Sequence, residues 1–135
     1  MILGVLSGRK EDDEVTRVSC ALAKLNNQKL KMIFVITIDR SLPIDKEVAE
    51  RTALAENALQ KMESLSKELK VKQSGEIIQA RFQGSAVVQQ IQEIGASTVV
   101  IGLPNQRPHD VFQKRKSVNY IYDHSECVVV TCQSQ

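Results

Sequence analysis

A basic segment that follows a short apolar run holds the residues of this sequence best suited to bind an anion. The run spans residues 99–101 and ends at Gly102, and the segment from there to residue 117 has one acidic residue, Asp110. Against this acid stand four basic side chains: Arg107, Lys114, Arg115 and Lys116. An unbroken β-branched run is typical of a strand buried on both faces of a parallel sheet, and ligands of open α/β sheets bind outside the carboxyl ends of such strands. Residues 102–117, here called the basic loop, are therefore the candidate binding loop.

Groups suited to catalysis are few. The chain has two histidines, His109 beside Asp110 in the basic loop and His124 before the last apolar run. An aspartate can tune a neighbouring imidazole for proton transfer, but adjacency in sequence says little about geometry, and a packing or capping role is favoured for His124. The sequence contains no serine nucleophile elbow, HExxH motif, P-loop or spaced carboxylate pair. We therefore expect that the protein is not an enzyme.

Neither the acidic run at residues 11–14 nor the cysteines predict a metal site. Four acids in the first turn of a helix complement the positive end of its dipole, which accounts for the run and leaves a metal as the remote alternative. The three cysteines, Cys20, Cys127 and Cys132, form no CxxC pair. An odd number of cysteines without a secretory signal indicates free thiols.

The elements that must position these residues alternate between strand-like and helix-like patterns. Strands are predicted at residues 2–6, 31–38, 76–80, 99–101 and 127–132. Helices are predicted from 11 to about 26, from about 46 to 69, from Ser85 as N-cap candidate to a stop at Gly95, and over roughly 116–124. The alternation predicts one α/β domain over residues 1–135, with a parallel sheet of five strands and helices on both faces.

Composition argues against several classes of function. The chain of 135 residues is 42% hydrophobic and 25% charged, as in an ordinary globular protein. A net charge of +2 is too small to predict a nucleic-acid or membrane partner, and 4% aromatic residues without Trp argue against a base-stacking platform. No signal-peptide pattern and no apolar run of membrane-spanning length is present, so we expect a cytoplasmic protein that binds no nucleic acid.

From end to end, the sequence resembles the universal stress protein family. The opening at residues 2–9 (ILGVLSGR) is similar to the family's I-L-V-A-V-D-G-S, Gly84 matches a glycine found after the third strand, and the segment 124–129 (HSECVV) resembles the family's H-A-P-C-P-V. The resemblance implies a nucleotide-binding-like α/β fold with five parallel strands.

The resemblance also implies a set of ligand-binding residues. The family's pattern G-x2-G-x9-G-[ST], whose glycines let backbone N–H groups approach the phosphates of ATP, maps with its spacing intact onto Gly102, Asn105, Arg115 and Lys116. Only the first glycine is kept, and Ser7 replaces the aspartate that closes the first strand in binding members. The candidate cofactor-binding residues are Ser7, Gly8, Gly102, Asn105, Arg107, Arg115, Lys116 and Ser117, and the implied cofactor is ATP or another adenine nucleotide.

Two interpretations of the basic loop remain open. In one, its charged side chains replace the lost backbone donors and capture an anion, since a guanidinium recognises phosphate with two hydrogen bonds. In the other, loss of glycine has closed the phosphate-binding site, and the basic side chains are solvated surface residues without a ligand. The acidic run at residues 11–14 weighs against the first, because the family's strand order places it across the same crevice.

The favoured function is a universal stress protein-like regulatory or interaction domain with a degenerate ATP-binding loop. Family members often dimerise through the last strand, where residues 128–130 (VVV) supply an apolar edge, so a homodimer is expected. The segments 42–45, 80–88 and 102–104 are similar to stress-protein domains appended to membrane transporters. The alternative is therefore a cytosolic regulatory domain of a transporter that senses ATP or a cyclic dinucleotide; a weak ATPase is a third hypothesis.

Overall fold

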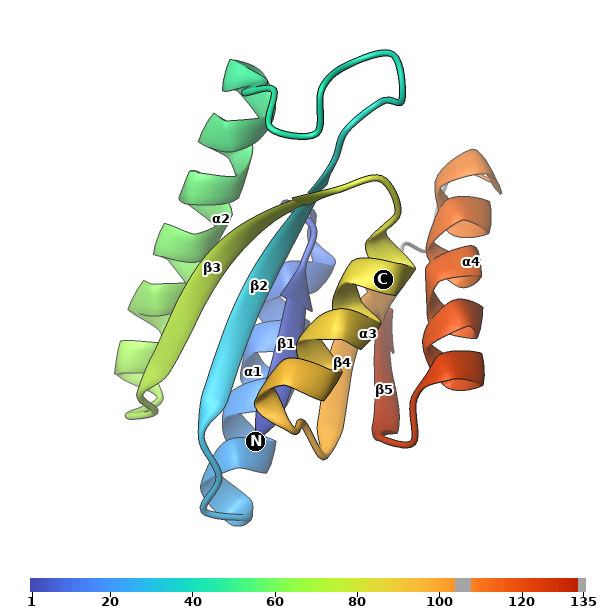
Figure 1. Cartoon of the computed structure of the whole chain (residues 1–135). Helices are drawn as coiled ribbons and strands as arrows, with labels where there is room; N and C mark the ends of the chain where they lie inside the picture. The colour runs from blue at the N-terminus through green and yellow to red at the C-terminus, as the bar shows by residue number, and fades with distance from the viewer. Residues whose placement is uncertain (104–107, 134–135) are drawn as a thin grey trace.

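A twisted sheet of five parallel strands forms the centre of the protein (Figure 1). The computed structural model describes residues 1–103 and 108–133, and gives only the course of the backbone for residues 108–114. The strands are β1 (Ile2–Leu6), β2 (Leu30–Thr37), β3 (Gln73–Ala80), β4 (Thr98–Leu103) and β5 (Val128–Gln133). Their order is β3-β2-β1-β4-β5, and every neighbouring pair is parallel. The predicted fold class is confirmed, including the placement of the first strand beside the fourth.

Two helices cover each face of the sheet (Figure 1). The helices are α1 (Glu11–Leu25), α2 (Ala49–Glu68), α3 (Gln83–Ile94) and α4 (Pro108–His124). Alternate residues of a strand point to opposite faces, so Ile2 and Leu6 of β1 pack beneath α1 and α2. Leu3 and Val5 of the same strand pack beneath α3 and α4. Because β1 is covered on both sides, all five of its residues are buried. Residues 99–101 of β4, the run predicted to be buried on both faces, are buried as well.

Several boundaries differ from the sequence-based expectation. Strand β3 begins at Gln73 rather than at residue 76, because backbone pairing with β2 extends through polar positions that carry no hydrophobic signal. Helix α4 begins at Pro108 rather than near residue 116, since the fixed φ of proline suits the first helical position. Most of the basic loop is therefore helical. The N-cap prediction for Ser85 is wrong: α3 starts at Gln83, and Ser85 Oγ donates to the carbonyl of Phe82 at 3.1 Å.

Two other local predictions are confirmed. Gly95 ends α3 in the left-handed conformation, with φ of 63°. All three cysteines are free thiols, two of them buried. Within residues 1–103 and 108–133, no helix is both long and apolar enough to cross a membrane.

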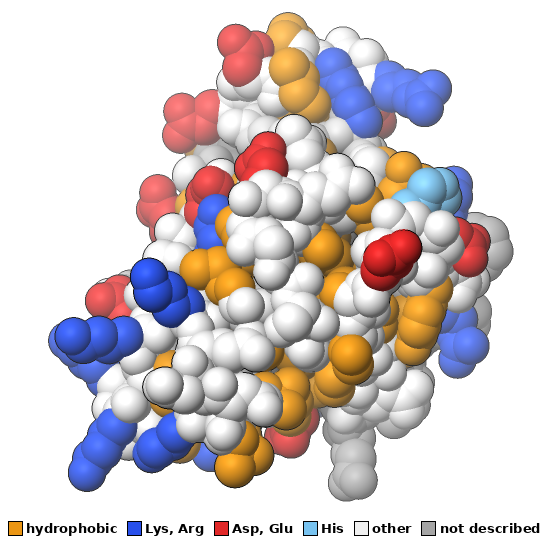
Figure 2. Space-filling view, turned by 60° about the horizontal axis from the view of Figure 1, so that its bottom comes forward, with side chains coloured by type: hydrophobic (Ala, Val, Ile, Leu, Met, Phe, Trp, Pro, Cys, Tyr) orange, Lys and Arg blue, Asp and Glu red, His pale blue; other side chains and the backbone are white. Residues whose placement is uncertain are grey.

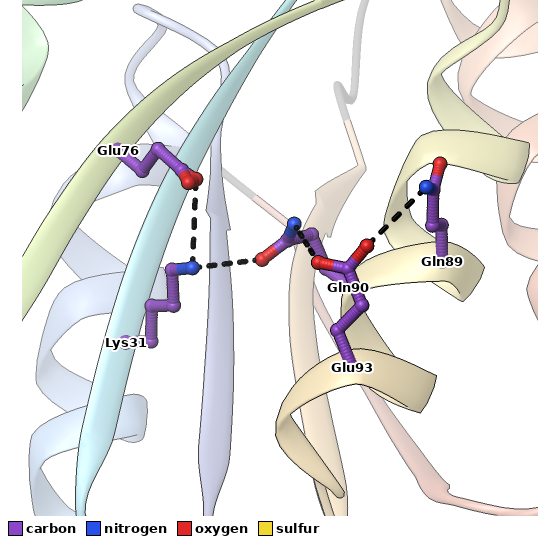
Figure 3. A network of polar contacts seen from close by, with 5 residues as sticks. All are labelled: Lys31, Glu76, Gln89, Gln90 and Glu93. Carbon is purple, nitrogen blue, oxygen red and sulfur yellow. Dashed lines mark hydrogen bonds and ion pairs between the residues drawn. The ribbon is translucent and has the colours of Figure 1, made fainter.

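A polar network ties β2, β3 and α3 together on one face of the sheet (Figure 3). Lys31 Nζ donates to Gln90 Oε1 at 2.9 Å and lies 3.5 Å from Glu76 Oε2. The Gln90 amide in turn donates to Glu93 at 3.2 Å. The Lys31 side chain is 18% exposed, so its charge is held where water reaches it only in part.

Replacing Lys31 with alanine should lower the free energy of unfolding by about 1–2 kcal/mol, because the buried amide of Gln90 loses its charged partner. Urea denaturation followed by circular dichroism measures the change. The matched control is the exposed Lys29→Ala, which should stay within about 0.5 kcal/mol of the unchanged chain. Equal effects of the two substitutions would contradict a structural role for the network.

Candidate functional site

An open cleft of about 580 Å³ lies at the carboxyl edge of the sheet, over the ends of β1 and β2. The strand order reverses at β1, and such a switch point is where ligands of open α/β sheets bind. The described lining residues are Leu6, Ser7, Gly8, Arg9, Phe34, Val35, Ile36, Thr37, Arg51, Leu54, Arg81, Phe82, Gln83 and Ser117. The cleft therefore collects residues from both strand ends and from the starts of α2 and α3.

The charge of the cleft has one sign among the residues that are described there. Arg9, Arg51 and Arg81 line it, and this part of the lining includes no aspartate or glutamate. The opposite end of the molecule differs, since Figure 2, which looks toward the amino ends of the strands, shows Lys and Arg side chains interspersed with Asp and Glu. A floor of apolar strand residues beneath three guanidinium groups suits a ligand that has both an apolar and an anionic part.

Two of the arginines are fixed by backbone carbonyl groups. Arg51 Nη1 donates to the Thr37 carbonyl at 2.6 Å and lies 3.2 Å from the Thr37 hydroxyl. Arg81 Nη1 donates to the carbonyls of Asp39 and Leu42 at 2.6 and 2.8 Å. Both side chains thus brace the connection between β2 and α2 and are held in place before any ligand arrives.

An acidic residue, Asp39, follows β2 and accepts one of these hydrogen bonds through its backbone carbonyl. The Ser41 backbone N–H, which donates to Asp39 Oδ1 at 2.9 Å, and the Ser41 hydroxyl lower the pKa of the Asp39 carboxyl, and the charge of Arg81 adds a smaller lowering. Asp39 therefore stays ionised at neutral pH. It does not line the cleft, so its negative charge lies outside the space that a ligand would occupy.

The turn between β1 and α1 is closed by a carboxylate of the chain itself. Asp12 Oδ1 accepts from the Ser7 N–H at 2.8 Å and from the Ser7 hydroxyl at 3.1 Å, while Asp12 Oδ2 accepts from the Gly8 N–H at 2.7 Å. The acidic run was interpreted as a complement to the helix dipole, and the structure gives Asp12 this additional role. Ser7 and Gly8 lie in the cleft, but their backbone donors are already used.

Gly102 has a packing function in this structure. A Cβ built at Gly102 would lie 2.6 Å from Cβ of Glu11 and 3.5 Å from a methyl group of Val15. The absence of a side chain therefore lets α1 lie directly against β4. Gly102 faces the layer of α1 and α2 and is not among the described residues of the cleft.

The remaining predicted site residues fall in three places. Ser117 is buried and lines the cleft, together with Ser7 and Gly8. Arg115 and Lys116 are exposed on α4, with Lys116 Nζ 5.7 Å from the centre of the Phe82 ring. Asn105 and Arg107 lie outside the described residues.

An aromatic cluster fills the space between the start of α3 and the end of α4. The rings of Phe82 and Tyr120 meet edge to face with centres 5.2 Å apart, and His124 stacks on Tyr120 at 3.9 Å. Nδ1 of His124 also lies 2.9 Å from the Tyr120 carbonyl. The packing role predicted for His124 is confirmed.

Sequence reasoning missed the three arginines of the cleft. No binding role was predicted for the charged residues of the second helix or for Arg81. Their positions carry a usable signal: Arg51 lies in the first turn of the helix after β2, and Arg81 directly follows β3. Side chains at such positions meet at the carboxyl edge of a parallel sheet.

Comparison with known proteins shows which solved structures share this fold. No protein-family model matches the sequence, and no protein of curated function matches it. Among solved structures, the universal stress protein of Archaeoglobus fulgidus in complex with dAMP matches with a TM-score of 0.75 and 12% identity, covering 97% of this chain and 95% of that one. A universal stress protein family member from Burkholderia pseudomallei matches with a TM-score of 0.71 and 17% identity, over 96% and 92% of the two chains. One from Arabidopsis thaliana with AMP bound matches with a TM-score of 0.64 and 12% identity, over 100% and 93%. The chain therefore has the fold of these proteins.

Proposed function

We propose that this chain, which has the universal stress protein fold, is a regulatory domain of that family and binds an adenine nucleotide in the cleft over β1 and β2. The observation that carries the proposal is the cleft itself, with its three arginines above an apolar floor. Two of the similar structures were solved with dAMP or AMP bound. A nucleotide combines the apolar and anionic parts that such a cleft suits.

A nucleoside monophosphate is favoured over a triphosphate. The triphosphate would need the glycine-rich cradle after β4, yet Gly102 packs against Glu11, and arginine occupies position 115. The amides of the turn after β1 are bound by Asp12. These features favour a degenerate ATP-binding loop and a domain that binds a nucleotide without hydrolysing it.

A homodimer through β5 belongs to the same proposal. β5 is an edge strand paired on one side with β4, and its first residue, Val128, is 61% exposed. An exposed apolar edge strand presents unpaired backbone groups to which another strand can bind, and a second copy of the chain can supply that strand. Attachment to a membrane transporter stays a prediction that rests on the sequence resemblance. Sedimentation at micromolar concentration tests the dimer, and the mass of a single chain throughout would contradict it.

The binding proposal is tested by thermal denaturation and calorimetric titration with AMP, cyclic AMP, ATP, cyclic di-AMP and adenosine. We expect AMP to stabilise the chain more than ATP does. A ligand at a hundred times its Kd adds about 2.7 kcal/mol to the free energy of unfolding, which shifts Tm by several degrees. No shift and no heat with any of the five compounds would overturn the proposal, whereas tightest binding of cyclic di-AMP would favour the dinucleotide sensor.

A further inference from the structure

We infer that the cleft holds the phosphate of its ligand at the end formed by β2 and β3, on Arg51, Arg81 and the start of α3. This inference rests on the proposed function and specifies the orientation of the nucleotide. The phosphate then lies away from the segment after β4, the place that the sequence resemblance implied.

The two arginines offer a pre-formed pair of anion donors. A guanidinium carries five N–H groups in a planar fork. Within the described part of the chain, the hydrogen bonds of both residues to the end of β2 and the connection after it are made through Nη1. The edge formed by Nε and Nη2 is the one suited to a phosphate, which accepts two parallel hydrogen bonds from such an edge. Because Nη1 is anchored on carbonyl groups, little side-chain entropy is lost when the anion binds.

The start of α3 adds further donors at the same end of the cleft. α3 has 12 residues and begins at Gln83, and within the described part of the chain no side chain caps its first turn. Ser85, the nearest hydroxyl in sequence, donates to the Phe82 carbonyl and leaves the first amides of the helix uncapped. Unpaired N–H groups at a helix start, together with the helix dipole, favour an anion. Phe82 and Gln83 line the cleft together with Arg81, so these amides and the guanidinium border the same space.

Two carboxylates of the described chain lie near the opposite end of the cleft. Glu11 is 3% exposed and packs against Gly102 of β4, and Asp12 closes the neighbouring turn. Neither carboxylate is among the described residues that line the cleft, but both lie on its β1–β4 side, so a phosphate there would be nearer to negative charge than one at the β2–β3 end. Among the described residues, an anion at the β2–β3 end therefore gains the guanidinium donors of Arg51 and Arg81 and lies away from these two carboxylates. The nucleoside part is left to the apolar floor between the two ends.

Calorimetric titration of AMP and adenosine into substituted chains tests this orientation. Arg51→Gln and Arg81→Gln should each weaken AMP binding about tenfold or more, and leave the affinity for adenosine within about threefold. Arg17→Gln, an exposed arginine of α1, is the charge-matched control and should bind both compounds as the unchanged chain does. Arg115→Gln tests the reverse orientation. A tenfold loss of AMP affinity there, with both cleft variants unaffected, would overturn the inference, as would equal loss of AMP and adenosine in the cleft variants.

A measurement on the unchanged chain tests the inference even if the substituted chains do not fold. It also separates this inference from the proposed function. Inorganic phosphate is titrated while NMR follows the Nε–H signals of Arg51 and Arg81 and the amide of Gln83. Saturable shifts of these signals support the anion site even if no nucleotide binds, in which case only the proposed function fails. If AMP binds and these three signals stay unmoved by phosphate and by AMP, the proposed function stands and the inference is wrong.

Discussion

Replacing Asp12 with alanine is expected to lower the free energy of unfolding by about 2–3 kcal/mol. Within the described part of the chain, the carboxylate accepts hydrogen bonds from two backbone N–H groups and one hydroxyl in a part-buried turn. Bonds to a charged acceptor are worth more than neutral ones, and their loss leaves the donors of Ser7 and Gly8 without this partner. Gly8 has φ of +79°, so the turn loses the contacts that hold an otherwise flexible residue. Urea denaturation measures the change.

The control for this prediction is Asp13→Ala. Asp13 is exposed in the same first turn of α1. Its replacement with alanine removes the same charge from the same end of the helix. We expect a cost within about 1 kcal/mol, as for a contribution to the helix dipole. Equal losses at the two positions would show that Asp12 acts only through the dipole, as the sequence-based interpretation had it.

Replacing Gly102 with alanine is expected to lower the free energy of unfolding by about 1–3 kcal/mol. The new Cβ would lie 2.6 Å from Cβ of Glu11, an atom fixed to the helix backbone. No rotamer change relieves this contact, so α1 must move away from β4. Chemical denaturation gives the loss of stability. Calorimetry well below the unfolding transition should show AMP affinity within about threefold of the unchanged chain, since the phosphate is expected at the other end of the cleft.

Gly75→Ala is the matched control for Gly102. It lies on the edge strand β3 and is exposed, and the nearest atom to an added Cβ is the end of the Leu59 side chain at 3.2 Å. A flexible side chain can give way, and alanine restricts the unfolded chain more than glycine, so stability should change by less than about 1 kcal/mol. A neutral Gly102→Ala that abolishes nucleotide binding would show that the glycine serves a ligand.

The sequence predicted most of the fold because the interior strands are unbroken apolar runs. β1 and β4 pack between helices on both faces, and burial of β1 and of the middle of β4 requires the apolar residues from which these strands were predicted. The predicted range of the edge strand β3 was too short, because Gln73 and Ser74 are polar and their pairing with β2 depends on backbone groups alone. The strand order came from the family resemblance, since periodicity does not state which strands are neighbours.

The candidate site was predicted less well than the fold, for a physical reason. Family spacing led to Ser7, Gly8 and Ser117, which do lie in the cleft, and to Gly102, which packs against a helix. Arg51 and Arg81 were missed because a guanidinium on a helix or after a strand resembles any solvated charge. Arg51 and Arg81 line the same cleft only because the ends of neighbouring strands meet in the folded sheet.

The middle position of β1 has a consequence for synthesis of the protein. β1 is made first, yet it pairs with β4, where Ile2 meets Thr98, and the Ser97 N–H donates to the Met1 carbonyl at 2.9 Å. While the chain grows on the ribosome, the hydrogen-bonding edge of β1 that faces β4 stays open until β4 has emerged. Such late closure slows folding and leaves the nascent chain open to mispairing. A translation pause or truncation before residue 98 is therefore where this polypeptide would most need a chaperone.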